Sequence, residues 1–186
     1  VTYDRLKAAE RTAGEDGWLT YSGAYSGQRY SAAAQISREN VSKLRVSWIR
    51  PIDGVGSNNV QSTPLVNGDL MFVTMPPQRV LAVSALNGSV RWEYTRQVPS
   101  DLVRGYGTIN RGVALLGDQV FLATLDSHLI ALDAMTGKVR WDVEVAPYRD
   151  GYTITAAPLA LDGLIITGIS GGDYPIRGFI DAYDAS

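Results

Sequence analysis

Few residues in this chain could carry catalytic or metal-binding chemistry. The sequence has no cysteine and one histidine, His128. Disulfides, thiolate catalysis and cysteine-ligated zinc are therefore excluded. The lone histidine also removes multi-histidine metal sites and argues against a Ser-His-Asp triad. Carboxylates remain, and we interpret Asp126, Asp142 and Asp150 as turn or solvated-face residues rather than as acid–base catalysts.

Composition narrows the class of protein further. The 186 residues are 45% hydrophobic and 19% charged, which is ordinary for a globular domain, and the formal net charge is −2. No basic block could grip phosphate backbones, so nucleic-acid binding is not expected. No run of about 18 apolar residues is present, so no membrane span is expected either. The first residues, VTYDR, do not form a signal peptide.

The elements that would position a site are mostly short strands. A helix is predicted over residues 3–11 and a capped helical turn over 37–41. Short apolar segments separated by Gly or Asp-Gly turns then indicate strands and hairpins. The predicted strands are 45–50, 63–66, 70–74, 80–83, 90–94, 112–115, 119–124, 129–132, 139–145, 157–161, 164–168 and 178–183.

A repeat organises these strands. Residues 82–92 (AVSALNGSVRW) align with residues 131–141 (ALDAMTGKVRW), and alanine, glycine and tryptophan recur at the same offsets. Residues 182–186 (AYDAS) begin a third copy. Such a period predicts a propeller, because a small four-stranded sheet can bury its faces only against neighbouring sheets around an axis.

Two positions of the repeat have a predicted structural role. The glycine is needed for a positive φ in the turn between the third and fourth strands. The tryptophan is a large flat side chain that fills the gap between blades, so Trp92 and Trp141 are architectural. Trp48 has a similar outer-strand setting, and we assign it to the strand that closes the ring.

The repeat A-x-D-A-x-T-G-x-x-x-W resembles the tryptophan-docking motif of the quinoprotein (PQQ-dependent) alcohol and methanol dehydrogenases, and residues 131–141 match it fully. Other segments resemble this family in the family's own order. They are residues 18–22 (WLTYS), 28–31 (QRYS), 35–48, 110–114 (NRGVA), 150–159 (DGYTITAAPL) and 168–185.

The resemblance implies an all-β fold of four-stranded antiparallel propeller blades, about three of the family's eight, after a short N-terminal helix. The expected division is a lead-in at 1–43 and a partial propeller at 44–186. In the family, pyrroloquinoline quinone (PQQ) lies in a central funnel beside a calcium or lanthanide ion. Alcohol is oxidised by hydride transfer to the quinone.

The resemblance also implies site residues. Arg111 matches an arginine that pairs with cofactor oxygens, to which a planar guanidinium is suited; the alternative is a surface salt bridge. Thr155 matches a threonine that hydrogen-bonds the cofactor; the alternative is that it is a β-branched residue of a strand with no such role. Ser170, Gly171 and Gly172 match a segment whose backbone approaches the quinone, where small residues are needed, or form only a hairpin turn.

The sequence departs from the family pattern at four positions. Asp173 occupies the position of a metal-ligating glutamate and is one methylene shorter. Gln61 stands where a glutamate usually touches the cofactor, so a hydrogen-bond acceptor is kept and the charge is lost. Gly105 and Tyr106 replace adjacent cysteines, and Tyr106 either stacks on the cofactor or belongs to a flexible loop.

The resemblance assigns no catalytic base, because the family's catalytic aspartate comes from later blades. The expectation is the N-terminal fragment of a PQQ-dependent alcohol dehydrogenase, inactive alone, whose full-length form uses a small alcohol and an electron acceptor. A periplasmic or secreted location is expected on the same ground. The alternative is a non-catalytic PQQ-like propeller that serves as a binding or assembly scaffold. Open sheet edges also suggest self-association.

Overall fold

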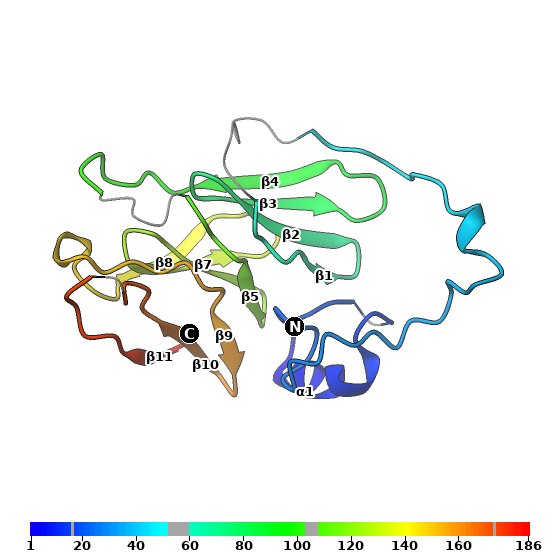
Figure 1. Ribbon diagram of the computed structural model, residues 1–186, viewed down its shortest axis with the longest axis horizontal. Helices are drawn as coiled ribbons and strands as arrows, with labels where there is room; N and C mark the ends of the chain where they lie inside the picture. The colour runs from blue at the N-terminus through cyan, green and yellow to red at the C-terminus, as the bar shows by residue number, and fades with distance from the viewer. Residues whose placement is uncertain (16, 52–59, 103–107, 173) are drawn as a thin grey trace.

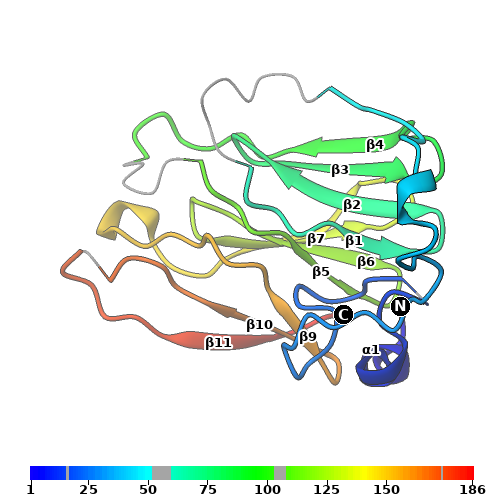
Figure 2. The same cartoon turned by 45° about the vertical axis from the view of Figure 1, so that its right-hand side comes forward.

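The computed structural model describes residues 1–15, 17–51, 60–102, 108–172 and 174–186. Three antiparallel sheets lie one above another, and each is built from strands that are consecutive in the chain (Figures 1 and 2). The first sheet contains β1 (Leu65–Asn67), β2 (Leu70–Met75), β3 (Arg79–Ser84) and β4 (Val90–Thr95). The second contains β5 (Val113–Leu116), β6 (Gln119–Ala123), β7 (His128–Asp133) and β8 (Val139–Glu144). The third contains β9 (Leu159–Leu161), β10 (Leu164–Gly168) and β11 (Ile180–Asp184).

Most predicted elements are found within two residues of their expected bounds. Helix α1 covers Tyr3–Thr12, and the side chain of Thr2 caps it by accepting from the Arg5 amide. Short 3-10 turns occupy Val41–Lys43 and Tyr148–Asp150. The predicted strand at 45–50 is wrong: no described residue pairs with this segment, and a strand without a ladder partner does not form.

The middle sheet is buried on both faces, because side chains of a strand point alternately to opposite sides. In β6, Val120 and Leu122 belong to the core shared with the first sheet, whereas Phe121 and Ala123 belong to the core shared with the third. Residues of β7 divide in the same way. Burial on both sides explains why these strands read as nearly continuous apolar runs.

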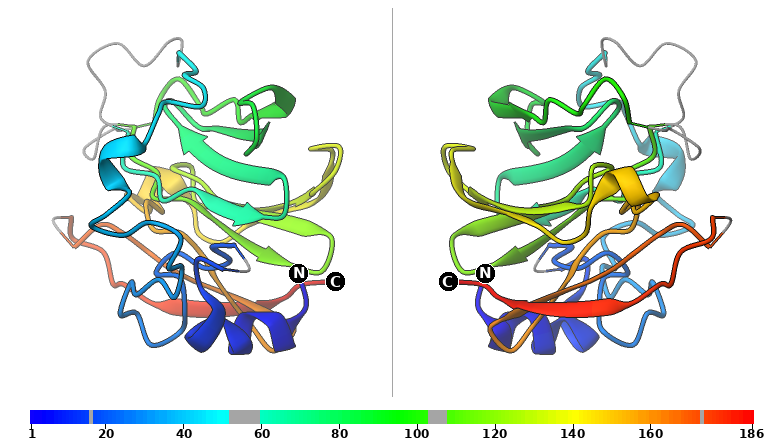
Figure 3. Two further views of the ribbon diagram at one scale, coloured as in Figure 1. Left: turned by 90° about the vertical axis from the view of Figure 1, so that its right-hand side faces the viewer. Right: turned by 90° about the vertical axis from the view of Figure 1, so that its left-hand side faces the viewer.

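Helix α1 lies on the side of the molecule that carries the third sheet (Figure 3). Its buried Leu6 joins Leu19, Ala114 and Ala160 in the core between the second and third sheets. Within the ranges described above, no helix has both the length and the apolar character needed to cross a bilayer.

Tryptophan docking joins the sheets as the repeat predicts. Trp92 of the first sheet is buried, and its indole Nε1 donates to the carbonyl of Ala134 in the second sheet at 2.9 Å. Its ring covers Gly137, where an added Cβ would lie 2.6 Å from the ring carbon Cε3. Glycine is therefore required twice over, for its φ of +70° and for the indole above it.

Trp48 uses the same contact on the first sheet. Its Nε1 donates to the Ala85 carbonyl at 3.0 Å, and its ring covers Gly88. Trp141 packs against the core between the second and third sheets, but its buried Nε1 has no hydrogen-bond partner in the described part of the chain.

A charged cluster joins the first two sheets at the opposite end of β7 from Gly137. Arg96, just after β4, donates to Asp126 through Nη2 at 2.8 Å and to Asp142 through Nη1 at 2.5 Å. Asp126 lies in a turn, which is one of the two expected settings, and its side chain is only 3% exposed. Burial alone would lower the pKa of Arg96, yet the hydrogen bond and charge of Asp126, with Asp142, raise it overall.

Candidate functional site

Three short segments precede the first strands of the three sheets, and main-chain hydrogen bonds join them across the blades. The Thr63 amide donates to the Arg111 carbonyl at 3.1 Å, and the Arg111 amide donates to the Thr155 carbonyl at 3.1 Å. We call Thr63, Arg111 and Thr155 the inter-blade belt. Because both backbone polar groups of Arg111 are bonded to neighbouring blades, its Cα is held in a fixed place.

Side chains extend the belt toward Ser170. Arg111 Nη1 donates to Thr155 Oγ1 at 2.8 Å, and Thr155 Oγ1 lies 2.9 Å from Ser170 Oγ. Ser170 follows β10, and its amide donates to the Thr153 carbonyl at 2.8 Å, which orients the hydroxyl. Three of the predicted site residues are thus brought together from two blades.

The two hydroxyl groups leave a donor for a ligand. Either oxygen of the Thr155–Ser170 pair can be the donor to the other. Since Arg111 already donates to Thr155 Oγ1, one hydroxyl hydrogen of the pair stays available in both arrangements. Together with the guanidinium, this arrangement offers a cation and a neutral donor to an oxygen-rich ligand.

The Arg111 side chain lines an open groove of about 520 Å³ with Tyr21, Ala156 and Pro158. Arg111 makes no ion pair with any described residue, so the surface salt bridge considered as its alternative has no partner there. Tyr25, which also lines the groove, donates to the Ala160 carbonyl at 2.7 Å. Burial, with a smaller effect of Tyr3, raises the pKa of Tyr25 to about 12, so the phenol stays protonated.

The two predicted glycines differ in their surroundings. Gly171 is buried with a φ of +133°, and an added Cβ would lie 2.4 Å from Ile176 Cδ1. The chain's own packing therefore accounts for glycine at this position. Gly172 has no atom within 4 Å of an added Cβ, so the space over it is open to a flat ligand.

The structure gives few or no contacts for the remaining predicted site residues. Gln61 is exposed and lies two residues before Thr63 of the belt. Tyr106 and Asp173 lie outside the described residues. The described part of the chain contains no group of three His, Cys, Asp or Glu side chains able to hold a metal ion. The donors of Arg111, Thr155 and Ser170 fit the polar groups of an organic cofactor, and this chain's proposed share of a metal site is Asp173.

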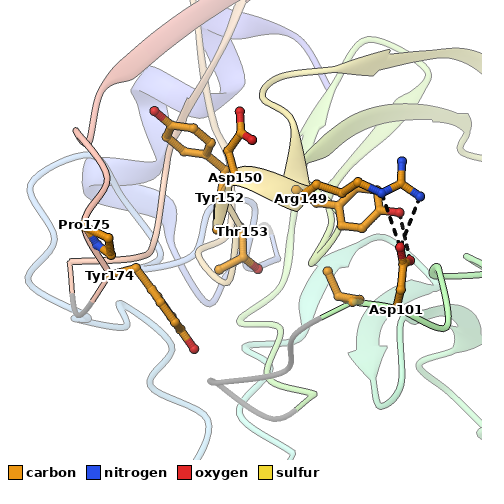
Figure 4. A pocket seen from close by; sticks show the side chains of 10 residues that line it. Asp101, Arg149, Asp150, Tyr152, Thr153, Tyr174 and Pro175 are labelled. Carbon is orange, nitrogen blue, oxygen red and sulfur yellow. Dashed lines mark hydrogen bonds and ion pairs between the residues drawn. The ribbon is translucent and has the colours of Figure 1, made fainter.

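A second pocket of about 320 Å³ adjoins the site through Thr153 (Figure 4). Asp101 accepts hydrogen bonds from Tyr148 at 2.9 Å and from Arg149 at 3.1 Å. Tyr174 lies on the opposite side of the pocket from Asp101. The hydrogen bond from Tyr148, together with Arg149, lowers the pKa of Asp101, which stays ionised. The pocket is therefore lined by one ion pair, Asp101–Arg149, and by tyrosine side chains.

Sequence reasoning assigned no role to Asn110, although it stands in the segment that was singled out. Asn110 is 5% exposed, and its side chain bonds the Gly112 amide and the Ala123 carbonyl. The spacing Asn-x-Gly is typical of a turn closed by the asparagine side chain, so a local signal was present.

The consecutive antiparallel sheets and the indoles docked between them define part of a β-propeller. Residues 18–186 match the family described as "Glucose/ethanol/alcohol dehydrogenase, beta-propeller domain". The chain belongs to this family, and the predicted family and fold class are confirmed.

Individual proteins agree with this assignment. The quinoprotein alcohol dehydrogenase PedH of Pseudomonas putida is 41% identical over 85% of this chain and 27% of its own length. The structure of the quinohemoprotein alcohol dehydrogenase ADHIIG of Pseudomonas putida HK5 has a TM-score of 0.87 at 35% identity, covering all of this chain and 27% of its own. A europium-containing methanol dehydrogenase has a TM-score of 0.84 at 34% identity, covering 97% and 32%. The chain thus spans about a quarter to a third of the length of these relatives.

Proposed function

We propose that this chain is the N-terminal part of a PQQ-dependent alcohol dehydrogenase and that it supplies part of the cofactor pocket. The full-length protein would oxidise a small alcohol and pass the electrons to a separate acceptor, in the periplasm or outside the cell. Family membership and the 41% identity to a quinoprotein alcohol dehydrogenase support this proposal.

The single observation that carries the proposal is the contact series Arg111–Thr155–Ser170. A guanidinium forms charge-assisted hydrogen bonds to carboxylate and carbonyl oxygens, and PQQ carries both. Arg111 borders an open groove, so its remaining donors can reach a ligand. The spare hydroxyl hydrogen of the Thr155–Ser170 pair supplies a second, neutral contact.

When bound, PQQ supplies the quinone carbonyl that accepts hydride from the alcohol. The residues of this chain bind and orient that group. Arg111 would neutralise negative charge on the bound group, Thr155 and Ser170 would hydrogen-bond its polar atoms, and Gly172 would leave room beside it. Asp173 and Gln61 are proposed as a metal ligand and a cofactor contact, and the metal would be calcium or a lanthanide. The name of the europium-containing relative supports the second choice.

A non-catalytic scaffold is the second candidate, because Gln61 and Asp173 depart from the residues usual in the family and no cysteine pair stands at Gly105 and Tyr106. These replacements would weaken a pocket without disturbing the blades. A scaffold, however, needs no partly buried arginine–hydroxyl series, which favours the enzyme.

Titration of the full-length protein with PQQ, in the presence of calcium or of a lanthanide, distinguishes the two functions. We expect the quinone absorbance to change on binding and the Arg111→Ala variant to lose that change. Arg91→Ala is the matched control, because Arg91 lies in β4 of the first sheet and pairs with Asp69 rather than with a residue of the Arg111–Thr155–Ser170 series. An unchanged spectrum in the wild-type protein would favour the scaffold.

The isolated chain tests two further parts of the proposal. We expect no dye-linked alcohol oxidation from it, since it holds no catalytic aspartate by family resemblance, and measurable turnover would contradict this. We also expect self-association, because the third sheet carries exposed Leu164 and Ile180 and its edge strand β11 pairs only with β10. A stable monomer on size-exclusion chromatography would contradict that expectation.

A further inference from the structure

We propose that Asn110 is a positioning residue for the cofactor site: it fixes the main chain on both sides of Arg111, so that the guanidinium is presented to PQQ. The inference rests on the proposed function, and it concerns a residue that contacts no ligand in that proposal.

The turn around Arg111 is closed by the side chain of Asn110. Asn110 Oδ1 accepts from the Gly112 amide at 3.0 Å, which spans Arg111 and forms an asparagine turn. Gly112 has a φ of +135°, and an added Cβ would lie 3.3 Å from the Thr63 carbonyl. The turn therefore needs both the asparagine acceptor and the glycine.

A second set of contacts anchors Asn110 to the blades. Its Nδ2 donates to the carbonyl of Ala123, the last residue of β6, at 2.8 Å. Its own carbonyl accepts from Thr74 Oγ1 at 3.3 Å, and the Thr74 amide donates to Ser62 Oγ at 3.0 Å. The amide side chain is 5% exposed, and both its ends are satisfied by protein groups.

Removal of the Asn110 side chain has a defined consequence. The Gly112 amide and the Ala123 carbonyl would lose their partner in a buried place, and the segment would shift to recover hydrogen bonds. The bonds to Thr63 and Thr155 hold the main chain at Arg111, so loss of the Asn110 contact to Gly112 would act on the peptide groups beside it and thereby on the direction of the Arg111 side chain. Asn110 therefore acts on the ligand through Arg111.

The test is a double-mutant cycle on PQQ affinity, measured by absorbance titration of the full-length protein in its apo form. We expect Asn110→Ala to weaken binding about tenfold and Arg111→Ala about a hundredfold, as for loss of charge-assisted hydrogen bonds. The double variant is expected to bind no more weakly than Arg111→Ala alone, since the first residue acts through the second. Additive losses, or wild-type affinity in Asn110→Ala, would overturn the inference.

Two controls separate positioning from loss of stability. Trp92→Phe removes a docking contact far from the site, so it is expected to lower the unfolding midpoint and leave PQQ affinity unchanged. If Asn110→Ala does not fold, Asn110→Ser carries the same cycle, because its hydroxyl can still accept from the Gly112 amide; we expect about a threefold loss. If the wild-type protein binds no PQQ, the proposed function falls and this inference with it, whereas wild-type affinity in the Asn110 variants overturns the inference alone.

Discussion

Replacement of Trp92 by phenylalanine measures how strongly indole docking holds two blades together. The change removes the hydrogen bond from Nε1 to the Ala134 carbonyl, which contributes about 1 kcal/mol. It also removes the five-membered part of a buried ring, which contributes about 1 kcal/mol of apolar burial. The expected loss in the free energy of unfolding is therefore about 2 kcal/mol.

Trp141→Phe is the matched control. Both tryptophans occupy the same position of the repeat, and each lies beside a phenylalanine, with ring centroids 5.9 Å apart for Phe72–Trp92 and 5.7 Å apart for Phe121–Trp141. The indole Nε1 of Trp141 has no hydrogen-bond partner among the described residues. In the 186-residue chain, on which both variants are compared, only apolar area is lost there, so the expected cost is at most about 1 kcal/mol.

The assay is urea unfolding followed by far-ultraviolet circular dichroism, since tryptophan fluorescence itself changes in these variants. If the hydrogen bond from Trp92 to the Ala134 carbonyl stabilises the blade pair, the urea midpoint is clearly lower for Trp92→Phe than for Trp141→Phe. Equal midpoints in the two variants, or a larger loss at Trp141, would show that the Ala134 contact does not stabilise the blade pair.

Three other predictions concern stability. Arg96→Ala should lower the free energy of unfolding by about 3 kcal/mol, because the buried Asp126 carboxylate loses its partner. Arg149→Ala breaks an exposed ion pair and should cost less than about 1 kcal/mol. Similar costs for the two variants would contradict this. Gly137→Ala should lower the thermal midpoint more than Gly117→Ala does: both have a positive φ, which costs about 1–2 kcal/mol, but only the first adds a clash with an indole. Hydrogen bonds from Arg140 and Thr136 lower the pKa of the Asp133 carboxyl in the folded protein below its ordinary 3.8. The ionised carboxyl therefore stabilises the fold above pH 3.8, and this stabilisation is lost as the pH falls through the pKa of the folded state. Asp133→Asn should flatten this acid dependence of the urea midpoint, and an unchanged pH profile would refute it.

The blades could be predicted from sequence because their signals are local. Short apolar segments, Gly and Asp-Gly turns and the glycine-to-tryptophan spacing identify most of the strands that the structure contains. The segment at 45–50 shows where this reasoning fails. Its composition is typical of a strand, yet a strand needs a partner, and composition does not reveal one. Trp48 nevertheless makes the docking contact that its residue type suggests.

Apart from tryptophan docking, the contacts between blades could not be predicted, because no local pattern marks them. Asp126 lies in a polar turn by sequence, but Arg96 from the preceding blade meets it in a buried place. The same is true of the inter-blade belt, where residues far apart in the chain share main-chain hydrogen bonds. The resemblance to a family identified Arg111, Thr155 and Ser170, and coordinates were needed to show that they form one series of contacts.

The first two blades are fastened at both ends of their shared interface, by Trp92 on Gly137 at one end and by Arg96 on Asp126 at the other. Two contacts at opposite ends of the interface resist rotation of one blade relative to the other. The angle between these two blades is therefore expected to stay constant. In a closed ring of joints of this kind, the diameter of the central opening would be constant. Admission of a molecule to the axis would then depend on rearrangement of the connecting loops, while the walls behind them stay in place.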